Sequence, residues 1–115
     1  MQAMKIDVKE NKGVKVLEVS GEIDFHSSRE LRVKFQEVLD QKCSKLLVNL
    51  RKVSYIDSSG LATFVEALQR IKRFGGKLVL AGLAPAVRGV FEIAKLDSIF
   101  SLSDSEEKGL VALVE

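Results

Sequence analysis

Short apolar runs alternate with amphipathic helical segments along this chain, and this alternation restricts the fold more than any other feature. The runs at residues 46–50 and 77–81 have the length and composition of strands that are covered on both faces. Strands that alternate with helices form a mostly parallel set with right-handed crossovers. The order β-β-α-β-α-β-α-β-α therefore predicts an α/β fold with a four- to five-stranded mixed sheet and flanking helices.

The first strands are expected to form a hairpin over residues 3–20, with a turn at Asn11-Lys12-Gly13. A helix is then expected to begin at Ser27 or Ser28, because Ser27 and Glu30 have the spacing of a capping box. Its apolar face is formed by Leu31, Phe35, Val38 and Leu39.

The clearest predicted helix follows residue 57 and ends at Phe74-Gly75-Gly76. Its apolar positions recur at helical spacing, namely Leu61, Phe64, Val65, Leu68 and Ile71. Pro85 suits the first turn of the next helix. A short last strand is expected over Ile99–Leu102, and Ser103 with Glu106 resembles a second capping box before a terminal helix.

Length and charge bound the class of protein. The 115 residues predict one domain, 1–115, and the net charge of +2 comes without the basic block that nucleic-acid binding requires. No apolar stretch reaches the roughly 18 residues of a membrane span. A lone cysteine, Cys43, fits a reducing compartment, so we expect a cytoplasmic protein. Cys43 and His26 have no partners at ligand spacing, so neither a metal nor a cofactor is expected.

The segment Val53–Leu61 places polar side chains at the start of the clearest helix. Unpaired N–H groups and the helix dipole favour an anion there. Asp57 or Ser58 could simply cap the helix, or a serine could act as a nucleophile or accept a phosphoryl group. Capping alone does not explain Ser58, Ser59 and Gly60 together. Gly60 suggests that something approaches the backbone closely at that position.

Enzymatic interpretations find little support in the residues. Ser58 lacks the Gly-x-Ser-x-Gly elbow of a hydrolase, and an Asp24–His26–Ser58 relay has no motif behind it. The run Gly75-Gly76-Lys77 is not a phosphate loop, because Leu78 follows it. A carrier with a covalent arm on Ser58 is a further alternative, but such carriers resemble acidic helical bundles. We therefore expect no catalytic residues.

The whole chain resembles the STAS domain family, and within it the bacterial anti-sigma-factor antagonists. The resemblance implies a curved sheet flanked by helices, with Ser58 as the phosphorylation site. It also implies a role for Asp24 in partner binding and phosphorylation. The expected partner-binding residues are Asp24, Asp57, Ser58, Ser59, Gly60 and Leu61. The segments that carry the resemblance are Val19–Asp24, Leu47–Leu50, Val53–Leu61 and Gly75–Leu80.

The function that this resemblance implies is a partner switch. The unphosphorylated antagonist binds an anti-sigma factor, which is typically also a serine kinase, and thereby releases a sigma factor. Phosphorylation on Ser58 ends the binding, and a serine phosphatase restores it. No direct contact with nucleic acid or membrane is expected. The alternative within the family is a STAS-domain adaptor in a sensory or lipid-transport complex.

Overall fold

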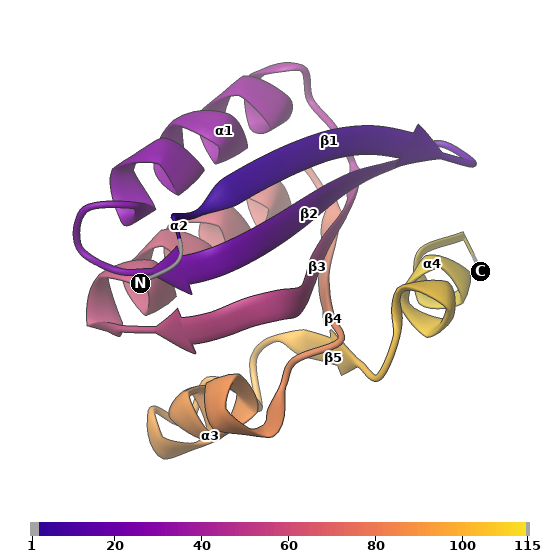
Figure 1. Cartoon of the computed structure of the whole chain (residues 1–115). Coiled ribbons are helices and arrows are strands. Elements are labelled where there is room, and N and C mark those ends of the chain that lie inside the picture. Colours follow the sequence, from indigo (N-terminus) through magenta and orange to yellow (C-terminus); the bar gives the residue numbers. More distant parts are fainter. Residues whose placement is uncertain (1–2, 115) are drawn as a thin grey trace.

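The elements follow the order predicted from the sequence, and the computed structural model describes residues 3–114 (Figure 1). The α/β class, the mixed sheet and the flanking helices are confirmed. The elements are β1 (Lys5–Asn11), β2 (Val14–Ile23), α1 (Ser28–Asp40), β3 (Lys45–Ile56), α2 (Ser58–Arg73), β4 (Lys77–Ala81), α3 (Pro85–Ile93), β5 (Ser101–Ser103) and α4 (Glu106–Val114).

The five strands lie in sequence order, β1-β2-β3-β4-β5, in one sheet. Strands β1 and β2 are antiparallel and form the predicted hairpin, while the other neighbouring pairs are parallel. Lys12 and Gly13 have φ of 53° and 80°, as a two-residue type I′ turn requires.

Strand β3 is longer than the predicted run of residues 46–50, and it is irregular. Its register with β2 shifts twice, between Glu18 and Ser20 and between Gly21 and Glu22. Each shift places extra β3 residues opposite β2, and such bulges bend and twist a strand. The bulges therefore account for the curved sheet in Figure 1.

Helices cover both faces of the sheet, and the core is divided accordingly. The larger apolar cluster joins α1, α2 and α3 to one face, and it contains Phe35, Phe64, Phe91 and Phe100. The rings of Phe35 and Phe64 lie 5.5 Å apart, those of Phe64 and Phe91 6.1 Å, and those of Phe91 and Phe100 5.6 Å. A smaller cluster joins Leu113 of α4 to the sheet, against residues such as Val16 and Leu47.

Neither predicted capping box is present, because Ser27 makes no side-chain cap bond and Ser103 does not lie at the start of α4. Ser27 precedes α1, but its side chain makes no cap bond and contacts the end of β2 instead. Ser103 belongs to β5, and α4 is capped by Ser105, whose Oγ accepts from the Lys108 N–H at 3.2 Å.

The last strand also differs from the predicted range Ile99–Leu102, because it spans Ser101–Ser103. The N–H groups of Ile99 and Phe100 both donate to the Leu96 carbonyl, each at 3.1 Å. That local turn prevents these two residues from pairing with β4. The strand therefore begins two residues later than the apolar pattern indicates.

Gly60 lets α2 approach the sheet closely. A Cβ built at this position would lie 2.7 Å from Ile23 Cγ2 and 2.7 Å from Ile56 Cγ1. Gly60→Val is therefore expected to lower the free energy of unfolding by about 1–3 kcal/mol through overpacking. Urea denaturation measures this change.

Gly89 of α3 provides the matched control. A Cβ at Gly89 meets nothing within 4 Å, so Gly89→Ala should raise stability by roughly 0.5–1 kcal/mol. A Gly60→Val protein that unfolds at the wild-type urea concentration would contradict the packing role of Gly60.

Candidate functional site

The predicted site residues lie where β2 and β3 end side by side. Ile23 pairs with Ile56, so Asp24 and Asp57 follow two neighbouring parallel strands at the same edge of the sheet. The Asp57 N–H donates to the Ile23 carbonyl at 3.1 Å and joins the two chain segments. This arrangement brings the two predicted motifs, which are far apart in the sequence, into one surface region.

Asp57 caps α2 with its side chain. Its backbone is extended, with φ −112° and ψ −173°, and its Oδ1 accepts from the Gly60 N–H at 3.1 Å. Its carbonyl accepts the first helical bond, from the Leu61 N–H at 3.0 Å. Because Asp57 provides the cap, the capping role does not require Ser58.

Ser58 is the first residue of α2 and is exposed to solvent. The first N–H groups of a helix have no partner within the helix, and the dipole there carries a partial positive charge. A phosphate on the Ser58 hydroxyl would therefore enter a favourable field. The site thus combines an accessible hydroxyl with a surrounding that suits an anion.

The residues after Ser58 become progressively buried. Ser59 is half-buried, and its carbonyl accepts from the Thr63 hydroxyl at 2.9 Å. Gly60 and Leu61 are buried, so the close approach that Gly60 indicated comes from Ile23 and Ile56 of this chain. A direct contact of Gly60 or Leu61 with a partner stays a prediction.

Asp24 organises the loop between β2 and α1, a role that sequence reasoning missed. Its Oδ1 accepts from the N–H groups of His26 and Ser27, both at 2.9 Å, and lies 3.2 Å from the Ser27 hydroxyl. The Asp24 N–H donates back to that hydroxyl, also at 2.9 Å. The hydrogen bond from the Ser27 N–H is the main reason that the pKa of Asp24 is lowered, so the carboxylate form is favoured. An aspartate followed three residues later by serine is the signal that could have indicated this turn.

The proposed Asp24–His26–Ser58 relay is not assembled. The Asp24 carboxylate binds the backbone N–H of His26, so it does not orient the imidazole. The exposed His26 ring instead packs edge-to-face against Phe25, with ring centres 5.7 Å apart. A catalytic dyad needs its orienting carboxylate on the ring, and this geometry lacks that bond.

The structure also bears on the possible metal ligands, on membrane-spanning helices and on Cys43. Across the described residues, cysteine, histidine and carboxylate side chains do not gather in threes or more as a metal site would require. Within residues 3–114, no helix combines the length and apolar character needed to cross a bilayer. Cys43 is half-buried, and its Sγ donates to the Lys45 carbonyl at 3.1 Å.

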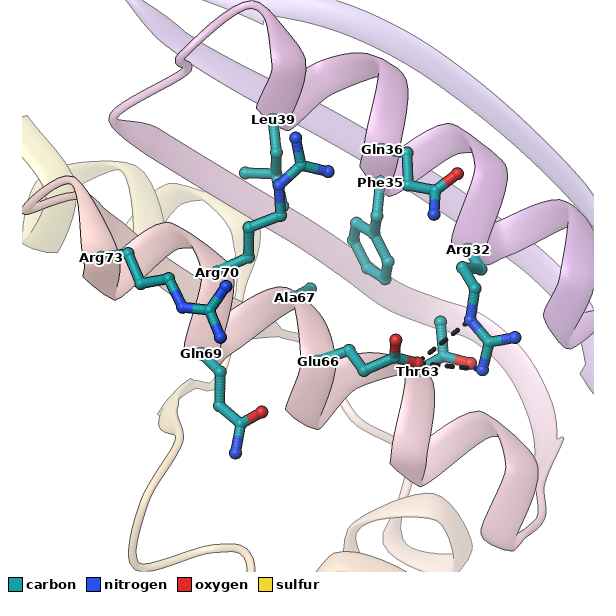
Figure 2. Close-up of a pocket in the computed structure, with 10 residues that line it drawn as sticks. All are labelled: Arg32, Phe35, Gln36, Leu39, Thr63, Glu66, Ala67, Gln69, Arg70 and Arg73. Atoms are coloured by element: carbon teal, nitrogen blue, oxygen red, sulfur yellow. Dashed lines mark hydrogen bonds and ion pairs between the residues drawn. The ribbon is translucent and has the colours of Figure 1, made fainter.

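A hollow of about 230 Å³ lies between α1 and α2, away from the predicted site residues (Figure 2). Arg32 of α1 pairs with Glu66 of α2, with Nη2 and Oε2 2.9 Å apart, and Arg70 of α2 pairs with Asp40 of α1. Exposed pairs of this kind contribute about 0–1 kcal/mol each. The hollow is lined by Arg32, Phe35, Gln36, Leu39, Thr63, Glu66, Ala67, Gln69, Arg70 and Arg73. It does not include the predicted serine or aspartates.

Together, these features define a small α/β domain that presents two short polar turns at one edge of a mixed sheet. The STAS domain model matches residues 5–109, and the chain belongs to the STAS domain family. A relative from Bacillus subtilis, an anti-sigma-B factor antagonist, is 35% identical over 107 residues. Those residues are 93% of this chain and 97% of the relative.

Solved structures show the same fold. An anti-sigma factor antagonist from Mycobacterium paratuberculosis superposes with a TM-score of 0.92 at 25% identity, covering 98% of this chain and 96% of the other. The Bacillus cell fate determinant SpoIIAA in its phosphorylated form matches with a TM-score of 0.74 at 21% identity, covering 94% and 98%. At 21% identity, the similarity to SpoIIAA supports the fold alone.

Proposed function

We propose that this protein is an anti-sigma-factor antagonist that works by partner switching. Its unphosphorylated form binds an anti-sigma factor that is also a serine kinase, and a sigma factor is released. The kinase transfers the γ-phosphoryl group of ATP to Ser58 Oγ, which loses its proton, and ADP leaves. The phosphorylated form dissociates, and a serine phosphatase restores the binding form.

The observation that carries this proposal is the position of Ser58. The hydroxyl is exposed at the first residue of α2, while the neighbouring Asp57 already supplies the helix cap. The Bacillus subtilis relative supports the choice of partner, because it is an anti-sigma-B factor antagonist at 35% identity. In this scheme the protein is the substrate of the kinase, and it performs no chemistry itself.

Replacing Ser58 tests the assignment of the phosphorylation site. Wild type should gain one phosphate by intact mass when incubated with ATP and the anti-sigma factor kinase of the source organism. Ser58→Ala should gain none and should stay bound to the kinase in gel filtration, because the switch cannot be turned off. Ser59→Ala is the control for the site of modification and should still gain one phosphate, because its Ser58 hydroxyl is intact.

Two outcomes would overturn the proposal in different ways. Phosphate on the Ser58→Ala protein would place the acceptor at Ser59 or another hydroxyl. A wild-type protein that neither binds the kinase nor gains phosphate would point to an adaptor role in a sensory or lipid-transport complex.

A further inference from the structure

Phe25 is an exposed aromatic residue in the loop that follows β2, two residues after Ile23. Its side chain is 59% exposed, the largest exposed fraction of any aromatic residue among residues 3–114. It follows Asp24 directly, and Asp24 lies beside Asp57 because the Asp57 N–H donates to the Ile23 carbonyl. The loop that carries Phe25 therefore leaves the sheet beside the segment that leads to Ser58.

The backbone around Phe25 is fixed on both sides. On one side, the Asp24 carboxylate accepts from the N–H groups of His26 and Ser27. On the other, the Phe25 carbonyl accepts from the Ser28 hydroxyl at 3.2 Å, and the Ser28 N–H donates to the Asp24 carbonyl at 2.8 Å. A loop held in this way has little backbone conformational entropy left to lose on binding.

The ring of Phe25 also has a fixed surrounding. The guanidinium carbon of Arg29 lies 5.5 Å from the ring centre, and the His26 ring packs against it edge-to-face. Phenylalanine and arginine are both enriched at protein–protein interfaces relative to the rest of the protein surface. The loop thus offers an apolar anchor with a positive charge beside it.

We propose that Phe25 inserts into an apolar pocket on the anti-sigma factor, with Arg29 facing an acidic side chain at the pocket's rim. This proposal rests on the proposed function. Asp24 then acts as a positioning residue. Its Oδ1 is already engaged by the loop, so it contributes to binding by holding Phe25 in place.

The first test compares two exposed phenylalanines by titration calorimetry with the unphosphorylated protein and the anti-sigma factor. Phe25→Ala should weaken binding by about 30-fold or more, the effect of a dominant interface residue. Phe74→Ala is the matched control. Phe74 is 37% exposed at the opposite end of α2, and its replacement should change affinity less than about threefold. Unchanged thermal melting of both variants excludes a folding effect.

The second test examines Asp24 as a positioning residue. Asp24→Ala should weaken binding in the wild-type background but add little in the Phe25→Ala background, since both changes remove the same anchor. Asp24→Asn keeps an oxygen that can accept from His26 and Ser27, so it should restore most of the affinity. Additive effects of Asp24→Ala and Phe25→Ala would contradict the positioning role.

The outcomes separate this inference from the proposed function. If Ser58→Asp abolishes the complex while Phe25→Ala leaves it intact, the anchor is wrong and the switch stands. If wild type forms no complex at all, the proposed function fails. A wild-type dimer that Phe25→Ala converts to a monomer would show a second copy of this chain in place of the anti-sigma factor, and would overturn the assignment of the partner.

Discussion

The protein phosphorylated on Ser58 is expected to bind the anti-sigma factor at least about a hundredfold more weakly than the unmodified protein. Helix α2 is expected to stay folded in both forms. In the free protein, the helix dipole stabilises an anion at this position by roughly 0.3–1 kcal/mol. Repulsion between two unit negative charges about 4 Å apart, the order expected for a phosphate next to the Asp57 carboxylate, costs roughly 1 kcal/mol in water. The two effects nearly cancel, and both are small against a domain stability of about 5–15 kcal/mol.

Partner binding at this surface is expected to change this balance, because it would remove water from around Ser58 and Asp57. At an effective dielectric constant near 20, the same repulsion rises to about 4 kcal/mol. The increase of about 3 kcal/mol corresponds to slightly more than a hundredfold in affinity. We therefore expect the free fold to tolerate the phosphate and the complex to reject it.

Calorimetric titration of phosphorylated protein and of Ser58→Asp measures the loss of affinity, and circular dichroism measures helicity. Ser58→Asn is the matched control, since it has the size of aspartate without its charge. The Ser58→Asn protein should lose much less affinity for the anti-sigma factor than the Ser58→Asp protein. Equal losses would make bulk the cause in place of charge, and a drop in helicity on phosphorylation would mean that the switch works by melting α2.

Phe64→Ala is expected to lower the free energy of unfolding by about 3–5 kcal/mol. Phe64 is fully buried, and its ring lies between those of Phe35 in α1 and Phe91 in α3. Its removal leaves a cavity where three helices meet, and fixed neighbours on the sheet limit how far that cavity can collapse.

Urea denaturation followed by circular dichroism gives the change, with Ile93→Ala as the surface control, since Ile93 is 86% exposed. The control should stay within about 0.5 kcal/mol of wild type. A loss below about 1 kcal/mol for Phe64→Ala would be incompatible with a central position of this ring in the core.

The fold was predictable because the spacing of apolar residues and the residues at turns and helix starts indicate the same elements along most of the chain. The type I′ turn at Lys12-Gly13, the helical apolar spacing after Asp57 and the proline at the start of α3 each indicate the observed element. The bulges of β3 were not predictable, because an extra residue in a strand leaves no mark in apolar alternation over so short a distance.

Capping was harder to predict, because short polar side chains compete for the same N–H groups. The Ser27 N–H donates to the Asp24 carboxylate, and the Glu30 N–H donates to the Ser27 carbonyl, so neither bond of the expected capping box forms. Ser103 and Ser105 both lie shortly before α4. Ser103 pairs with Ala81 in the sheet, so Ser105 is the residue that caps the helix. At the site, burial of Gly60 depends on Ile23, which is distant in the sequence, so only the fold reveals it.

The loop at Asp24 has a consequence for how such domains diversify. The bonds that hold it come from Asp24, Ser27 and Ser28, and none involves the side chain of Phe25. The exposed residue can therefore be exchanged during evolution without loss of the loop or of the core. With Phe25 as the proposed anchor, several domains of this kind within one cell could share a scaffold and still bind different partners, because recognition and folding would then depend on different side chains.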